Sequence, residues 1–262
     1  MMSIDDTFAA VSWLFAWAVS LQTVELARLR HRFRAGGAWD FAVFSDPRAP
    51  RLIPFACVCG PFPQVLAVIS LRGVAAVLLA ADLHPLGATT VLATTLVLAW
   101  RFRGPVNGGS DAMTTIVATA LCVASWTDHP KWRLGALWYI SIQIILSYWL
   151  AGWAKLRADG WRRGHALPTF LRQACYNPRG FSQWLLARPR LARVAGWVVV
   201  GFELAFPVVL VFPSALPVML VAGVGFHAVT VYALGLTRFL WVWVAGYPAL
   251  TYCVGQFSSD SM

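Results

Sequence analysis

A lysine at the end of a long apolar run is the residue whose chemistry first suggests a function. Lys155 lies in YWLAGWAKL, and the chain has only one other lysine, Lys131, whereas its other basic residues are arginines. On a helix, Gly152, Ala151 and Tyr148 share the face of Lys155. Two small residues and a phenol beside an amine suit a pocket, where an amine, unlike a guanidinium, can act as a base. The alternative is an interfacial lysine that extends toward the lipid headgroups.

Three further ionisable residues lie in the middle of apolar segments, where they are costly unless they have partners. These are Arg72 in AVISLRGVAAV, Glu203 in VVVGFELAFPVVL and His227 in VAGVGFHAVTVYA, and Gln143 lies at a similar depth in its segment. One interpretation is a structural ion pair between Arg72 and Glu203. The other, which three such residues together favour, is a polar pocket with Lys155 as its base.

The neighbours of two of these residues also carry information. Pro207 follows Glu203 by four residues and removes the donor for its carbonyl, so we expect an interrupted helix there. Gly223 and Thr230 form a small, partly polar stripe beside His227. Such a stripe packs against another helix or leaves room for a ligand.

The turn NGGSD, which runs from Asn107 to Asp111, is expected to start a helix. Ser110 or Asp111 suits the cap of that helix. A glycine turn at a helix N-terminus can bind anions, but Asp111 repels them and the phosphate-loop spacing is missing. We therefore count Asn107 and Asp111 as candidate pocket residues at a helix start.

The elements that must position these side chains are membrane-spanning helices. With 59% hydrophobic residues, 12% charged residues and a mean hydropathy of +0.65, the composition excludes a soluble globular protein. The sequence predicts an all-α, polytopic transmembrane bundle with about eight spans in a single domain, 1–262, without a separate soluble domain. The predicted spans are 8–27, 62–82, 86–101, 111–127, 133–155, 194–213, 215–236 and 239–256. The third and fourth are short, and either fits a tilted or re-entrant element.

The charge distribution predicts an orientation. The net charge of +10 comes from arginines in the loops between apolar segments, chiefly the long loops 29–61 and 156–193. This pattern is typical of cytoplasmic loops that face anionic lipid, and it argues against a nucleic-acid partner. It predicts a multi-pass protein of a bacterial inner membrane with both termini outside, and it places Lys155 near the cytoplasmic face. The first residues, MMSIDD, are acidic, so we expect no cleaved signal peptide.

The cysteines suggest no site. The chain has five, which are scattered and form neither a CxxC pair nor a Cys/His cluster with zinc spacing. We expect reduced, structural thiols and no metal site.

Several of these segments resemble the HTTM family, the membrane domain shared by vitamin K-dependent gamma-carboxylase and many bacterial proteins. YWLAGWAKL with the following W..GHAL is similar to the family's Y-F-x-A-G-x-x-K-L and W-x-x-G. GFELAFPVVLVF and FHAVTVYALGLTRF follow in the family's order. NGGSD is similar to the N-G-G-D of bacterial members.

The resemblance implies that Lys155 is a catalytic base whose substrate is a reduced quinone similar to vitamin K. In the carboxylase the oxidation of that quinol drives the carboxylation of a peptide glutamate. Glu203 and His227 fall within matching stretches and are expected to be pocket or structural residues. Three departures argue against full gamma-carboxylase activity. A histidine that the carboxylase uses aligns near 107–111, where this chain has none. We also expect the extramembrane domain that binds the propeptide to be absent. Finally, the charge distribution places Lys155 on the cytoplasmic side, whereas the carboxylase works on the lumenal side.

Two functions therefore stay open. The first is a membrane enzyme that acts on a quinol or another lipophilic substrate, with Lys155 as general base. The second is a non-catalytic membrane subunit for the maturation, assembly or export of a small peptide or partner protein. An ion-coupled transporter has less support, because the sequence has no inverted repeat.

Overall fold

The computed structural model describes residues 2–44, 61–81, 84–102, 108–173 and 180–259, and within these ranges every regular element is a helix. The predicted all-α class is thus confirmed. The described chain divides into two compact units, 2–140 and 141–259, and each is described by itself. The single domain over 1–262 stays a prediction.

Each of the eight predicted apolar segments contains an α-helix, although the sixth, 194–213, extends past the end of its α-helix into a 3₁₀ helix. The helices are α1 (Ile4–Arg28), α4 (Gln64–Ala80), α5 (His84–Arg101), α6 (Gly109–Ser125), α7 (Pro130–Arg157), α11 (Pro189–Ala205), α12 (Leu216–Leu234) and α13 (Thr237–Ser259).

Not all of these helices are long and apolar enough to cross a membrane. Within the described ranges four stretches are, namely Ile4–Arg28, Pro130–Arg157, Pro189–Leu210 and Pro213–Leu234. α4 and α6 are apolar but have only 17 residues each. Such a helix rises about 25 Å, less than the roughly 30 Å of a hydrocarbon core. The structure therefore supports a multi-pass membrane protein, whereas the number of eight spans is not confirmed.

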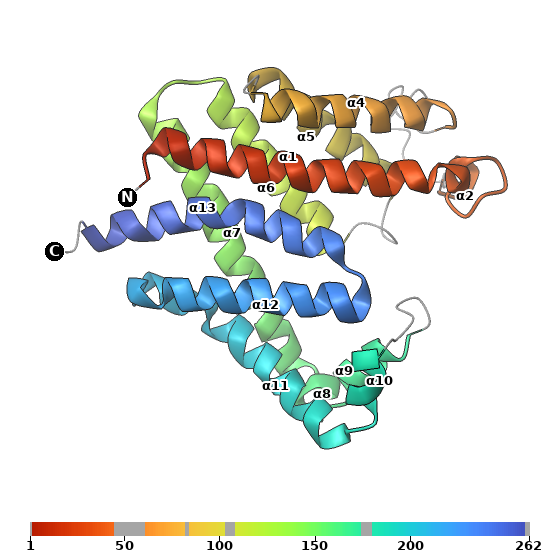
Figure 1. Cartoon of the computed structure of the whole chain (residues 1–262), viewed down its shortest axis with the longest axis vertical. Helices are drawn as coiled ribbons and strands as arrows, with labels where there is room; N and C mark the ends of the chain where they lie inside the picture. The colour runs from red at the N-terminus through yellow and green to blue at the C-terminus, as the bar shows by residue number, and fades with distance from the viewer. Residues whose placement is uncertain (1, 45–60, 82–83, 103–107, 174–179, 260–262) are drawn as a thin grey trace. The chain divides into compact units, whose positions relative to one another are not determined.

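The unit 2–140 is built around α1, α4, α5 and α6. α4 packs against both α1 and α5, and α5 packs against α6 (Figure 1). α1 begins with a capping box, in which the Ser3 hydroxyl accepts from the Asp6 N–H at 3.0 Å and the Asp6 carboxylate accepts from the Ser3 N–H at 3.3 Å. The first turns of α7 also belong to this unit.

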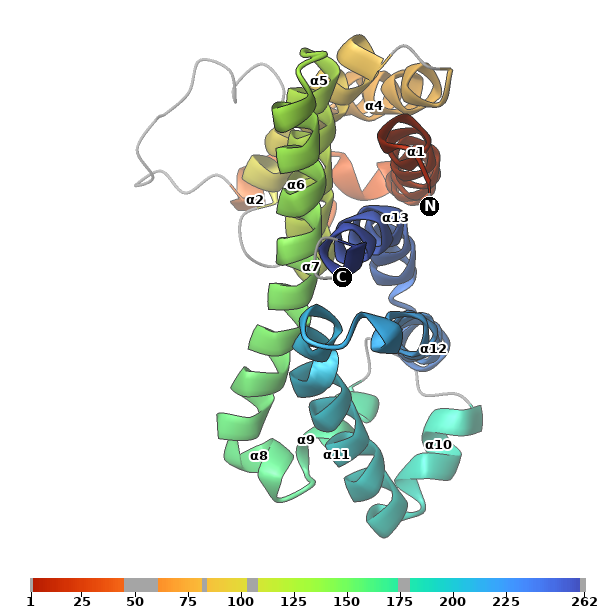
Figure 2. The same cartoon turned by 90° about the vertical axis from the view of Figure 1, so that its left-hand side faces the viewer.

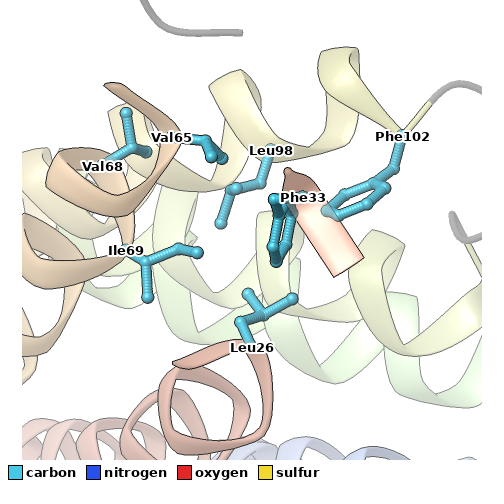
Figure 3. Close-up of a cluster of buried hydrophobic side chains, with 7 residues drawn as sticks. All are labelled: Leu26, Phe33, Val65, Val68, Ile69, Leu98 and Phe102. Carbon is cyan, nitrogen blue, oxygen red and sulfur yellow. The ribbon is translucent and has the colours of Figure 1, made fainter. Parts of the chain in front are cut away.

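A cluster of buried apolar side chains joins these helices where α1 ends and α4 begins (Figure 3). Its members come from α1, the 3₁₀ turn η1 (Arg30–Phe33), α4 and the end of α5, and they are Leu26, Phe33, Val65, Val68, Ile69, Leu98 and Phe102. The ring of Phe33 lies 5.7 Å from that of Phe102. These contacts hold the segment that follows α1 against α4 and α5.

The unit 141–259 contains the rest of α7 and the helices after it, and Figure 2 shows α11 beside the last turns of α7. The segment 156–193, which the sequence predicted as a loop, contains three short helices: α8 (Asp159–Arg162), α9 (Ala166–Leu171) and α10 (Gly180–Leu186). α12 and α13 form a hairpin, and Gly235 ends α12 with a φ of 70° that only glycine adopts without strain.

The predicted interruption after Glu203 is present. α11 ends at Ala205, and the chain continues as the 3₁₀ helix η3 (Phe206–Leu210), which contains Pro207. A second 3₁₀ turn, η4 (Pro213–Ala215), leads into α12. Proline lacks the donor that an α-helix needs at this position.

Candidate functional site

The centre of the site is an ion pair between α7 and α11. The ammonium of Lys155 donates to both carboxylate oxygens of Glu203, at 2.6 and 2.7 Å. The Glu203 side chain is 3% exposed and that of Lys155 is 22% exposed, so Lys155 is the more accessible member of the pair. The Lys155 nitrogen also lies 5.4 Å from the centre of the Trp161 ring.

A glycine allows the two helices to approach. A Cβ atom at Gly152 would lie 2.9 Å from the Cβ atom of Glu203 and 2.9 Å from the backbone nitrogen of Leu204. Any larger residue would push α11 away from α7. The small residue that the sequence placed beside Lys155 is therefore needed for the ion pair.

About two turns before Lys155 on the same face of α7, a tyrosine joins two more helices. The hydroxyl of Tyr148 lies 2.7 Å from Nε2 of His227 on α12 and 2.8 Å from the hydroxyl of Tyr247 on α13. Gly223 leaves the space for this meeting, because a Cβ atom there would lie 3.2 Å from the Tyr148 hydroxyl and closer still to that of Tyr247. The small stripe beside His227 thus packs against neighbouring helices.

Aromatic rings surround this hydrogen-bonded group. Tyr148 stacks on Phe206 with ring centres 4.2 Å apart. The His227 ring lies 5.0 Å from that of Phe226 and 5.2 Å from that of Trp243. His227, at 2% exposure, is thus held in an apolar environment.

One atom of His227 lacks a hydrogen-bond partner among the described residues. Nε2 is bound to Tyr148, but Nδ1 is buried and makes no hydrogen bond there. If Tyr148 donates to Nε2, Nδ1 carries a proton without an acceptor; if Tyr148 accepts, Nδ1 is an acceptor without a donor. A buried polar atom left in this state costs about 1–3 kcal/mol. Nδ1 is therefore an unused hydrogen-bonding atom among the described residues.

Arg72 lies in the other unit and has a different environment. It is 2% exposed and donates to Oε1 of Gln22 at 2.9 Å and to the hydroxyl of Thr95. Gln22 in turn donates to the Thr114 hydroxyl at 3.0 Å. The interpretation of Arg72 and Glu203 as an ion pair is wrong, because both carboxylate oxygens of Glu203 accept hydrogen bonds from Lys155.

The NGGSD turn begins a helix, as predicted. The Asp111 carboxylate accepts from the Gly108 N–H at 3.3 Å at the start of α6. Asp111 belongs to the unit 2–140, and Asn107 lies outside the described residues. No group of three or more His, Cys, Asp or Glu side chains within the described ranges could hold a metal ion.

The structure brings together five of the predicted residues, namely Tyr148, Gly152, Lys155, Glu203 and His227. It adds Tyr247, which the sequence analysis missed because tyrosines were considered only where they share a helix face with a charged residue or histidine. Tyr247 had one usable signal, since it precedes Pro248 inside α13. A tyrosine hydroxyl beside a proline places a polar group next to a backbone carbonyl that lacks its usual donor.

Comparison with known proteins gives a family. The model of the HTTM domain matches residues 118–253, just over half of the chain. The match includes every residue of the ion pair and of the Tyr148–His227–Tyr247 group. No curated protein and no solved structure was found to match the chain.

Proposed function

The chain belongs to the HTTM family, and from this we propose that it is an integral membrane enzyme in which Lys155 acts as a general base. Its substrate would be a lipophilic molecule with an acidic hydroxyl group, such as a reduced quinone. The observation that carries the proposal is the pair of hydrogen bonds from Lys155 to a buried carboxylate.

An ion pair of this kind can exchange its proton. Removing two charges from water costs several kcal/mol per ion, which their attraction offsets only in part. Transfer of one proton from Nζ of Lys155 to Glu203 removes both charges and leaves a neutral amine. The proton moves along an existing hydrogen bond of 2.6 Å, so neither side chain has to rearrange.

The neutral amine can then accept a proton from the hydroxyl group of the substrate. Lys155 becomes an ammonium again and stabilises the negative charge that develops on that oxygen, while Glu203 holds the first proton. The partial exposure of Lys155 gives a ligand access to the amine, whereas Glu203 is closed to solvent. Arginine cannot do this, because it keeps its proton.

The surroundings of His227 support a flat, hydroxylated ring as the substrate. The aromatic rings of Phe226, Phe239 and Trp243 face His227. The Nδ1 atom of His227 offers one hydrogen bond to a polar group. A quinol, when bound, supplies a ring hydroxyl that loses its proton to a base.

The cellular setting is part of the proposal. We place this protein in a bacterial cytoplasmic membrane, with both termini outside and Lys155 near the cytoplasmic face, on the basis of the arginine distribution. A bilayer also dissolves the substrate class proposed, so the substrate can reach the helices from the side.

Mass spectrometry of the purified protein tests the substrate class. The protein is extracted in mild detergent, and its bound molecules are compared with those of the Lys155→Gln variant. We expect a quinone, quinol or another lipophilic hydroxylated molecule at close to one per chain in at least one form. A stoichiometric peptide or protein without a small molecule would contradict the enzyme and favour a maturation or assembly subunit.

One observation favours that second function. Only 17% of the span Pro213–Leu234 is buried within the structure, and Val218, Val221 and Tyr232 are 69%, 73% and 68% exposed. Lipid tails can cover this face, and so can the helix of a partner protein. The same purification distinguishes the two, because a bound partner would be recovered with the chain.

A further inference from the structure

A second candidate binding site lies in the unit 2–140, away from the residues discussed so far. A cavity of about 230 Å³ opens at the end of the unit where α1 and α5 begin and α4 and α6 end. Figure 1 shows the N-terminus and the α6–α7 connection at this end. The cavity shares no residue with the proposed enzyme site, so its function is independent of the enzyme proposal.

The lining of the cavity is apolar inside and polar at the rim. Phe8, Leu79 and Leu121 form apolar walls, and Ser125, Asp128 and Arg133 supply polar groups. The ends of membrane helices lie at the boundary between hydrocarbon and water, where phospholipid headgroups are found. The lining therefore suits an amphipathic ligand.

The position of the Arg133 guanidinium suits the binding of an anionic group. One of its nitrogens lies 2.6 Å from a carboxylate oxygen of Asp5, and its guanidinium lies 5.0 Å from the centre of the Phe8 ring. The ring of Phe8 limits the positions of the guanidinium, which has five donors in a planar fork that matches phosphate. Asp5 is 73% exposed and Arg133 is 24% exposed. An exposed carboxylate is a weak competitor, so a phosphate group can displace it.

Asp128 gives the same rim a negative charge and can bind a positive group in the ligand. A primary ammonium has three donors, which the Asp128 carboxylate and the nearby hydroxyls of Ser125 and Thr127 can accept. A trimethylated ammonium has no donor for them. The volume corresponds to about eight water molecules at roughly 30 Å³ each, which is enough for a small headgroup.

We propose that this cavity binds the headgroup of a phospholipid that carries a primary amine. Arg133 binds the phosphate, Asp128 binds the ammonium, and the apolar walls contact the start of the acyl chains. Binding of such a lipid would hold this end of the unit 2–140 at the headgroup region of one leaflet.

The test is a lipid titration followed by native mass spectrometry of the full chain in mild detergent. The probes are short-chain phosphatidylethanolamine, phosphatidylcholine and phosphatidylglycerol, together with free phosphoethanolamine. We expect the ethanolamine lipid to bind about tenfold more tightly than the other three probes. The choline lipid loses the hydrogen bonds of the ammonium, the glycerol lipid loses the positive charge, and free phosphoethanolamine loses the acyl contacts.

Three variants give effects of different sign. Arg133→Gln should weaken binding of the ethanolamine lipid about tenfold or more, whereas Asp5→Asn should strengthen it because the competing carboxylate is gone. Asp128→Asn should remove the preference for the ethanolamine lipid over the glycerol lipid. If Arg133→Gln does not fold, the other two variants still decide the matter, because Asp5 and Asp128 are exposed.

Two results would overturn the proposal. Equal binding of the three lipids would show that the rim does not recognise the headgroup. Binding of free phosphoethanolamine as tight as that of the lipid would show that the cavity takes a water-soluble ligand.

Discussion

Each of the two units holds a basic side chain among its helices, and the two are held by different partners. In the unit 2–140, Arg72 donates to the side chains of Gln22 and Thr95 and to the carbonyl of Val91, all of them neutral. In the unit 141–259, Lys155 donates to the carboxylate of Glu203. Arg72 is 2% exposed, and the side chain of Lys155 is 22% exposed.

This difference separates a structural charge from a reactive one. An arginine keeps its proton under all ordinary conditions, and amide, hydroxyl and carbonyl oxygens do not remove it. The contacts of Arg72 therefore fix the positions of α1, α4 and α5. A lysine beside a carboxylate can lose its proton to it, and its partial exposure leaves room for a substrate. Only the second arrangement supports acid–base chemistry.

The largest effect on stability is expected from breaking the ion pair. Lys155→Met leaves the buried Glu203 carboxylate without its cation and should lower the free energy of unfolding by about 3 kcal/mol. Arg72→Met leaves neutral groups unpartnered and should cost about 1–2 kcal/mol. Denaturant titration in mixed micelles at pH 8 measures both.

The control is a second substitution at Glu203. Glu203→Gln should restore most of the stability lost in Lys155→Met, because no buried charge then remains, and it should not rescue Arg72→Met. If Glu203→Gln fails to rescue Lys155→Met, or rescues both variants, the two charges do not differ in the way described.

A smaller effect is expected at the glycine beside the tyrosine hydroxyls. Gly223→Ala places a methyl group against Tyr148 and Tyr247, so it should cost about 1–3 kcal/mol through overpacking. Gly225 on the same helix has no atom within 4 Å of an added Cβ, so Gly225→Ala is the matched control and should not destabilise. Equal effects of the two variants would mean that Gly223 does not make room for the hydroxyls.

The smallest effects are expected from the hydroxyls themselves. Tyr148→Phe removes two hydrogen bonds and leaves Nε2 of His227 without its Tyr148 partner, so it should cost about 2 kcal/mol; Tyr247→Phe removes one and should cost about 1 kcal/mol. The same titration gives both values. A larger cost for Tyr247→Phe would place the centre of the group on α13 rather than on Tyr148.

Much of the fold could be predicted from the sequence, because apolar segments of suitable length form α-helices in a bilayer, where the backbone must satisfy its own hydrogen bonds. All eight segments contain an α-helix. The helical spacing that put Tyr148 and Gly152 on the face of Lys155 agrees with the structure, in which Gly152 lies against α11 and Tyr148 bonds to α12. The break after Glu203 followed from Pro207, whose missing donor acts locally.

The partners of the polar residues could not be predicted in the same way. Spacing along one helix gives the face of a residue but not the helix that covers that face. Arg72 was therefore considered for Glu203, whereas its contacts include Gln22, 50 residues away, and Glu203 binds Lys155, 48 residues away. Similarly, the three short helices in 156–193 lack the long apolar pattern that identifies a span.

The central claim, that Lys155 removes a proton from a lipophilic hydroxyl group, is tested most directly by comparing the two lysines of the chain. Purified protein in lipid nanodiscs is given a reduced naphthoquinol and oxygen, and formation of the quinone is followed by absorbance, since deprotonation speeds the loss of electrons from a quinol to oxygen. We expect Lys155→Arg to lower the protein-dependent rate by about 100-fold or more and Lys131→Arg to leave it unchanged. A Lys155→Arg variant as active as Lys131→Arg would contradict the central claim.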